Sequence, residues 1–207
     1  LGDTSAVDGQ RYLSFGDGTV YLAADDPLET YEISLSDCIL NDEVPVMDQV
    51  TAIAFSGEED YEVSYLEDGS AYSPRADDLY FTERDGDTLP LDTDRVETYL
   101  SALATLNLTD YTTYSVTDAE LEQFGLDDPE LTVTVDYTSE DEDGADRSGT
   151  FTLHISRDPD QRAQAEESAG TDESADTDEE EAITAYARVG DSSIVYVITE
   201  LEYTDLM

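Results

Sequence analysis

The pattern of apolar and polar positions along the chain is mostly that of β-strands. Residues 131–137 alternate Leu, Val, Val and Tyr with polar residues, as expected for a strand with one buried and one solvent-exposed face. Residues 151–155 repeat this alternation after an acidic turn. Other segments with strand character are 10–23, 50–55, 61–65, 79–83, 88–91, 183–189 and 193–199. Short turns separate most of them, so we expect an antiparallel meander.

Two of these segments carry more specific expectations. In 10–23 the turn Gly16-Asp17-Gly18 joins two short strands. The candidates for their packed surface are Tyr12, Phe15, Val20 and Leu22. Segment 193–199 is apolar on both faces, which predicts a central strand that is covered on both sides.

A three- to four-residue period of apolar positions predicts a helix over residues 94–107 that lies across the sheet. Asp94 and Glu97 are spaced for a reciprocal cap at its first turn. A further helical segment is indicated after Asp26-Pro27, because proline fits the first position of a helix.

A second, short helix is indicated by residues at its two ends. Thr117 and Glu120 are spaced to cap each other, and Gly125 suits the left-handed position that closes a helix. The predicted fold class is therefore α+β: an antiparallel β-sheet meander with one longer and one or two short helices packed on it.

Residues 11–22 and 185–197 resemble each other, which indicates an internal repeat. Tyr12 matches Tyr186, Gly16-Asp17 matches Gly190-Asp191, and, after a slip of one residue, Tyr21 matches Tyr196. We therefore expect tandem-repeat organisation in a piece of a longer protein. Residues 1–45 are predicted to be the C-terminal part of a first repeat unit, and residues 46–207 a second, nearly complete unit.

The composition is strongly acidic. Asp and Glu number 53 against 8 basic residues, all Arg, which gives a formal net charge of -45. Repulsion between like charges makes nucleic acid an unsuitable partner. The same repulsion opposes direct binding of this fragment to an anionic membrane. A basic protein or weakly associated cations are the better expectation. Residues 158–182 form an acidic segment without aromatic residues and are predicted to be a disordered insertion.

Candidate chemistry is sparse along the chain. The only histidine, His154, is expected on the solvent-exposed face of its strand, and the only cysteine, Cys38, as a half-buried thiol at the end of a helix. Asp17 and Asp191 can attract cations only diffusely. The 14 tyrosines fit strand faces, or an exposed face that binds a partner. No nucleophile, phosphate-loop or zinc motif is present.

The segment from Ser139 to Thr150 resembles a calcium loop at four positions, Ser139, Asp141, Asp143 and Gly144. Thr150 occupies the position of the bidentate glutamate, so a hairpin turn is the better interpretation. We accordingly predict no catalytic, cofactor-binding or metal-ligating residues and no cofactor.

Two stretches carry a resemblance to a known family. Residues 117–135 read TDAELEQFGLDDPELTVTV and residues 185–197 read AYARVGDSSIVYV. This arrangement resembles the DUF4340 family over about residues 46–207, with residues 1–45 as the tail of another unit. The glycine that the family carries after the strand at 151–155 is replaced by Ser156-Arg157-Asp158.

The resemblance implies a bacterial extracytoplasmic protein of the cell surface, tethered to the membrane or lipid-anchored through a segment outside this sequence, often with tandem units. Some members of the family are associated with transporter-type gene sets. The expected function is a non-enzymatic binding or scaffold module of the cell envelope, accessory to a transporter-type assembly and with another envelope protein as partner. The alternatives are calcium binding or a salt-adapted surface, and thirdly an enzyme that acts on polysaccharide.

Overall fold

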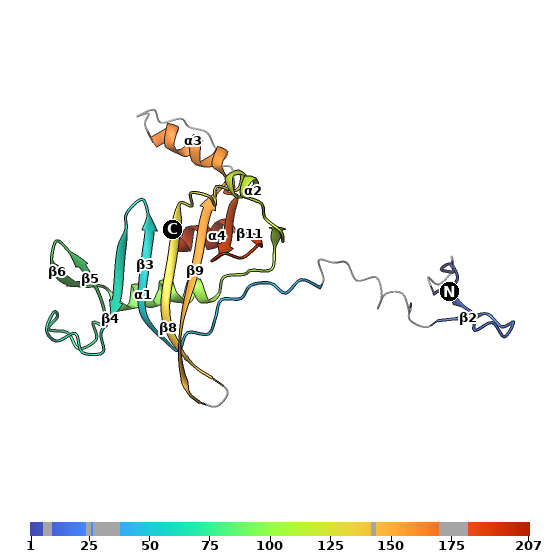
Figure 1. Ribbon diagram of the computed structural model, residues 1–207, viewed down its shortest axis with the longest axis horizontal. Coiled ribbons are helices and arrows are strands. Elements are labelled where there is room, and N and C mark those ends of the chain that lie inside the picture. The colour runs from blue at the N-terminus through green and yellow to red at the C-terminus, as the bar shows by residue number, and fades with distance from the viewer. Residues whose placement is uncertain (6–9, 24–25, 27–37, 142–143, 170–181) are drawn as a thin grey trace. The chain divides into compact units, whose positions relative to one another are not determined.

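The computed structural model describes residues 1–5, 10–23, 26, 38–141, 144–169 and 182–207. The chain divides into two compact units, Leu1–Leu40 and Asn41–Met207. The larger unit contains an antiparallel sheet with helices on its faces (Figure 1), so the predicted α+β class is confirmed. The assignment of the two units to parts of a tandem repeat stays a prediction.

The sheet of the larger unit has nine strands in the order β6-β5-β4-β3-β8-β9-β10-β11-β7, and every neighbouring pair is antiparallel. The strands are β3 (Gln49–Gly57), β4 (Tyr61–Tyr65), β5 (Tyr80–Arg84), β6 (Asp87–Pro90), β7 (Tyr111–Thr113), β8 (Leu131–Glu140), β9 (Asp146–Arg157), β10 (Ala185–Val189) and β11 (Val195–Ile198). Two meanders, β3 to β6 and β8 to β11, therefore meet where β3 pairs with β8.

Helices α1 (Thr93–Ala104) and α4 (Glu200–Leu206) pack on one face of the sheet (Figure 1). The core under them consists of the apolar residues that alternate along the strands, as the sequence predicted. Its most deeply buried side chains include Ile53, Leu103, Val133, Val135, Leu153, Ile155 and Tyr196. Burial of such side chains contributes roughly 1.5–3 kcal/mol each to folding, which makes this layer the main source of stability.

Helix α2 (Asp118–Gln123) brings a smaller apolar cluster, formed by Phe124, Leu126 and Val195. The predicted cap is confirmed: the Thr117 side chain accepts from the Glu120 amide, and the Glu120 carboxylate accepts from the Thr117 amide at 2.8 Å. Gly125 takes the predicted left-handed conformation, with φ 68°. Local hydrogen bonds therefore determine where this part of the chain turns.

Two predictions about regular structure are wrong in detail. Helix α1 is capped by Asp92, whose side chain accepts from the Arg95 amide, and not by Asp94. Strand β11 is covered on both sides at Val195 and Tyr196, which are fully buried, but it lies one strand in from the edge formed by β7, and Val197 is 38% exposed. The cap of α1 differs from the prediction because Asp92 directly precedes the first helical turn, where its side chain can reach the free backbone amides. Asp94 lies within that turn.

The predicted disordered insertion is partly helical. Helix α3 (Pro159–Ala169) occupies its first part, and residues 170–181 lie outside the described residues. The Asp158 side chain accepts from the Asp160 amide at 3.0 Å, and Pro159 stands at the first helical position. This start signal outweighs the acidic composition. No helix among the described ranges is long and apolar enough to cross a membrane.

The smaller unit contains a two-stranded sheet of β1 (Tyr12–Leu13) and β2 (Tyr21–Leu22). The two strands confirm the predicted hairpin, but its proposed packed surface is exposed: Phe15 to 78%, and Tyr12, Val20 and Leu22 to 40% or more. The described residues of this unit are too few to form a layer over these side chains. The helix predicted after Asp26-Pro27 lies outside the described residues.

The hairpin of the smaller unit reproduces the register of the β10–β11 hairpin in the larger one. Tyr12 pairs with Leu22 and Leu13 with Tyr21, while the matched residues pair Tyr186 with Val197 and Ala187 with Tyr196. The first strand of each hairpin also pairs with a further segment on the side away from its hairpin partner. In the smaller unit Arg11 forms a bridge with Thr4, and in the larger unit the matched residue, Ala185, pairs with Arg157. Register follows from turn geometry and side-chain pattern, so the agreement is what a repeat of one fold predicts.

Candidate functional site

His154 lies on the face of β9 opposite the main core, as predicted, but it is half-buried rather than open to solvent. Its Nδ1 is 2.9 Å from the Thr132 hydroxyl. Burial lowers the pKa of His154, and the neighbouring Arg188 guanidinium lowers it further, against the opposing charge of Asp191. No cluster of three possible metal ligands occurs among the described residues, so this histidine has no ligand set there.

We predict that the imidazole of His154 titrates below pH 6.5, the usual value for histidine. Its neutral form is favoured in the fold, so its contribution to stability is complete above pH 6.5 and declines as pH falls through the lowered pKa. Since the chain has one histidine, its ring proton signals in an NMR titration are unambiguous. The variant Arg188→Gln removes the repulsion and should raise this pKa. A value above 6.5 in the unmodified chain would contradict the described environment.

The calcium-like segment lies at the turn between β8 and β9, in accordance with the hairpin interpretation. The Asp141 carboxylate accepts from the Ala145 amide and from Arg147 Nε, at 2.9 and 2.8 Å. These donors occupy the oxygens that a calcium ion would use. Asp143 lies outside the described residues.

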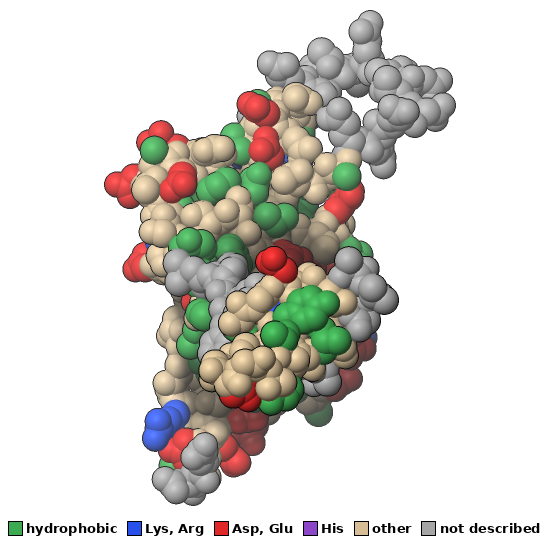
Figure 2. Space-filling view, turned by 90° about the vertical axis from the view of Figure 1, so that its right-hand side faces the viewer, with side chains coloured by type: hydrophobic (Ala, Val, Ile, Leu, Met, Phe, Trp, Pro, Cys, Tyr) green, Lys and Arg blue, Asp and Glu red, His purple; other side chains and the backbone are tan. Residues whose placement is uncertain are grey.

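The other residues that the sequence analysis weighed do not form a centre either. Cys38 is exposed and not half-buried. Asp17 accepts from the Thr19 amide at 2.8 Å, which is the contact of a turn residue. Acidic side chains are spread over the visible face in Figure 2 and not gathered at one point. Spread in this way, they repel one another less than a compact cluster would.

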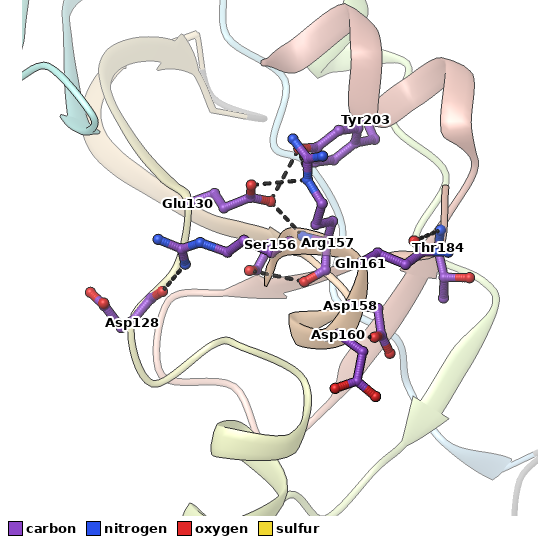
Figure 3. Close-up of polar contacts among 10 residues, drawn as sticks. Asp128, Glu130, Ser156, Arg157, Asp158, Asp160, Gln161, Thr184 and Tyr203 are labelled. Carbon is purple, nitrogen blue, oxygen red and sulfur yellow. Dashed lines mark hydrogen bonds and ion pairs between the residues drawn. The ribbon is translucent and has the colours of Figure 1, made fainter. Parts of the chain in front are cut away.

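A polar cleft of about 740 Å³ lies at the start of β8 and the end of β9, beside α3. Figure 3 shows its central contacts, in which the Glu130 carboxylate accepts three hydrogen bonds. They come from the Arg157 amide at 2.7 Å, from Arg157 Nε at 3.0 Å and from the Tyr203 hydroxyl at 3.1 Å. The guanidinium also lies over the Tyr203 ring, at 5.4 Å from its centroid. We call these three residues the Glu130 network.

The Glu130 network connects the end of β9 to α4. Burial raises the pKa of the Tyr203 hydroxyl, and the Glu130 carboxylate raises it further, so this tyrosine stays neutral and donates. At the mouth of the cleft, Arg162 donates to the Asp128 carbonyl at 3.1 Å. Because the Glu130 carboxylate already accepts from three donors, we interpret the network as a structural link between β9 and α4. In this arrangement the carboxylate is not available as a general base.

A second concave region is apolar and lies on the α1–α4 face of the sheet. We call it the α1–α4 groove; its volume is about 470 Å³, within the range of ligand sites. Strands β3 and β4 form its floor, and side chains of α1 and α4 form its walls. Its apolar lining includes Ile53, Phe55, Val63, Val96 and Leu206.

Three aromatic rings lie side by side in the α1–α4 groove. Phe55 stacks on Tyr61 with ring centroids 4.5 Å apart, and meets Tyr99 edge-on at 5.3 Å. The Tyr99 hydroxyl is buried, and in the part of the chain that the structure describes it has no hydrogen-bond partner. Burial raises its pKa, and Tyr61 adds to the shift, so the group is a neutral phenol at physiological pH. A buried polar group of this kind calls for a partner.

The rim of the groove is charged. Asp92, Asp205 and Arg95 lie at its edge, and Arg95 Nε is 3.7 Å from the Asp92 carboxylate. Both of these side chains are exposed, so their attraction is weak. The frequency of tyrosine indicated a binding face as one alternative, but the sequence did not indicate this groove. Its walls come from helices that are far apart in the sequence, and no local sequence pattern predicts that these helices lie next to each other.

Comparison with known proteins identifies a family. The profile described as "Domain of unknown function (DUF4340)" matches residues 84–204, which is more than half of the chain. No curated protein and no solved structure matches the chain. The family description names no enzymatic activity. The matched range runs from the end of β5 into α4 and includes the Phe124-Gly125-Leu126 turn from which the resemblance was inferred. The chain therefore belongs to the DUF4340 family.

Proposed function

We propose that this chain is a non-enzymatic binding and scaffold module of an extracytoplasmic cell-envelope assembly, and that the α1–α4 groove is where it binds a partner protein. The groove is the observation that carries the proposal. It combines an apolar floor, an exposed aromatic side chain and a buried hydroxyl that has no partner among the described residues. Large apolar surfaces with aromatic residues are typical of protein interfaces.

The repeated hairpin register supports the scaffold part of the proposal. A hairpin equivalent to β10–β11 occurs at β1–β2 with the same residue pairing. In the larger unit the equivalents of Leu13 and Tyr21 are fully buried, at Ala187 and Tyr196. In the smaller unit Tyr21 is 43% exposed. Further residues of the same fold would cover such a surface, in accordance with a protein that has several units.

Site-specific crosslinking in the native cells tests the partner proposal. A photoreactive amino acid replaces Tyr61 of the full-length protein in one strain and Tyr72 in another. The two tyrosines are similarly exposed, at 49% and 51%, but only Tyr61 lines the groove. We expect a reproducible adduct with one envelope protein from position 61 and none from position 72. The partner is then purified, and its affinity for the module is measured directly.

Two outcomes would contradict the proposed function. Equal adducts from both positions, or none from position 61, would remove the groove as the partner site. Turnover of a defined substrate by the purified protein, abolished by changes in one cleft, would replace the scaffold proposal with an enzymatic one. Polysaccharide fragments are the first substrates to test, since paired carboxylates can cleave glycosidic bonds.

A further inference from the structure

We infer that the α1–α4 groove recognises a segment of the partner protein in which a lysine or arginine stands beside an apolar residue. The inference rests on the proposed function and names the chemistry of the partner. Its basis is the combination of an aromatic floor, a buried phenol and a rim whose carboxylates outnumber its single guanidinium.

The aromatic rings favour a cation with a long hydrocarbon stem. Tyr61 stacks on Phe55 with an interplanar angle of 19° and is 49% exposed, so flat aromatic surface is accessible at the groove. A guanidinium or ammonium group is attracted to such a ring, and its methylene groups cover apolar surface at the same time. Arginine also stacks through its planar head group.

The charges around the groove favour a cation over an anion. Asp92 and Asp205 line it against the single guanidinium of Arg95, and Glu59 lies close enough to Tyr61 to raise that residue's pKa in addition to burial. The chain as a whole carries a formal net charge of -45, so an anionic ligand would approach against the field of the protein. Complementary charge accelerates the encounter with a basic partner and excludes acidic ones.

The Tyr99 hydroxyl favours a peptide segment over a purely apolar ligand. A neutral phenol donates one hydrogen bond and accepts others. The backbone of an inserted segment offers both a carbonyl and an amide, so it can satisfy this group where an acyl chain cannot. Binding would thus pair a hydroxyl that is buried without a partner among the described residues.

Three blocked tripeptides test the inference: acetyl-Leu-Xaa-Leu-amide, where Xaa is arginine, its neutral analogue citrulline, or glutamate. Octanoate serves as a probe for an anionic apolar chain. Binding is followed by NMR shifts of the Tyr61 and Tyr99 rings in 0.5 M NaCl, where the screening length of about 4 Å suppresses diffuse attraction to the acidic surface. We expect the arginine peptide to bind at least tenfold more tightly than the citrulline and glutamate peptides, and more tightly than octanoate.

Three variants locate the interaction. Tyr99→Phe and Asp205→Asn should each weaken the arginine peptide about fivefold or more. Asp146→Asn removes the same charge at the exposed start of β9, outside the groove, and should change the affinity by less than about 1.5-fold. Circular dichroism verifies that each variant is folded. Tyr99→Phe keeps the ring and removes only the hydroxyl.

The outcomes separate this inference from the proposed function. If octanoate or the glutamate peptide binds as tightly as the arginine peptide, the cationic preference is overturned, while a crosslink at position 61 keeps the proposed function. If Asp146→Asn weakens binding as much as Asp205→Asn, the attraction is diffuse and the site is overturned. If no probe shifts the two rings and position 61 gives no adduct, both proposals fail.

Discussion

Replacing Glu130 with glutamine is expected to lower the free energy of unfolding by about 2 kcal/mol. The substitution retains the shape of the side chain but removes the charge that accepts from the Arg157 amide, Arg157 Nε and the Tyr203 hydroxyl. The Glu130 and Arg157 side chains are 11% and 26% exposed, so the guanidinium loses its partner in a place where water compensates poorly. Urea denaturation followed by circular dichroism measures the change.

Glu140→Gln is the matched control for Glu130→Gln. Glu140 is the last residue of β8, the strand that Glu130 directly precedes; it is exposed, and its neutralisation changes the net charge by the same amount. We expect a change within about 0.5 kcal/mol there. Combining Glu130→Gln with Arg157→Met should cost less than the sum of the two single changes, because the double variant has no unpaired charge. Equal effects at positions 130 and 140 would show that the Glu130 network does not hold α4 to the sheet.

Gly125→Ala is expected to destabilise the larger unit by about 3 kcal/mol. Gly125 has φ 68°, a region that alanine adopts only with strain. A Cβ atom there would lie 2.8 Å from Ser156 Oγ and 3.3 Å from Pro159 Cγ. Both the backbone and the packing of the turn against β9 therefore oppose the substitution, and thermal unfolding measures the loss.

Two further variants separate the backbone cost from the packing cost at Gly125. Gly144 has φ 75°, but a Cβ there would meet nothing within 4 Å, so Gly144→Ala carries only the backbone part of about 1 kcal/mol. Ser156→Ala removes the hydroxyl that the new Cβ would approach. In that background, Gly125→Ala should lower the free energy of unfolding by at least about 1 kcal/mol less than it does in the unmodified chain. If Gly125→Ala and Gly144→Ala lower the free energy of unfolding equally, the close approach to Ser156 does not contribute to the cost at position 125.

Features determined by neighbouring residues were predictable from the sequence. The capping pair of Thr117 and Glu120 and the closing Gly125 were assigned correctly, because each interacts within a few positions. The same capping signal occurs at Thr199 and Glu202 and begins α4, yet this helix was missed although the signal was present. The predicted strand ended at residue 199, and no element was assigned to the residues after it.

Features that depend on distant residues were not predictable. Glu130 and Arg157 are 27 positions apart, and Glu130 and Tyr203 are 73 apart, so no local spacing indicates the Glu130 network. The α1–α4 groove likewise requires the placement of two helices over one sheet. Composition was misleading for α3, where an acidic segment without aromatic residues was taken as disordered although Asp158 and Pro159 signal a helix start.

The junction between the two meanders has a consequence for the order of folding. Within each meander, consecutive strands are joined by short or moderate connections, but β3 pairs with β8 through residues such as Gly57 and Leu131, which are 74 positions apart. The entropy of closing so long a loop must be overcome before this pairing contributes any stability. Early in folding, the two meanders would thus be separate hairpin arrays with uncovered edges at β3 and β8. We expect their docking to be the slow step, and until it occurs either edge can pair with an exposed strand edge of another molecule.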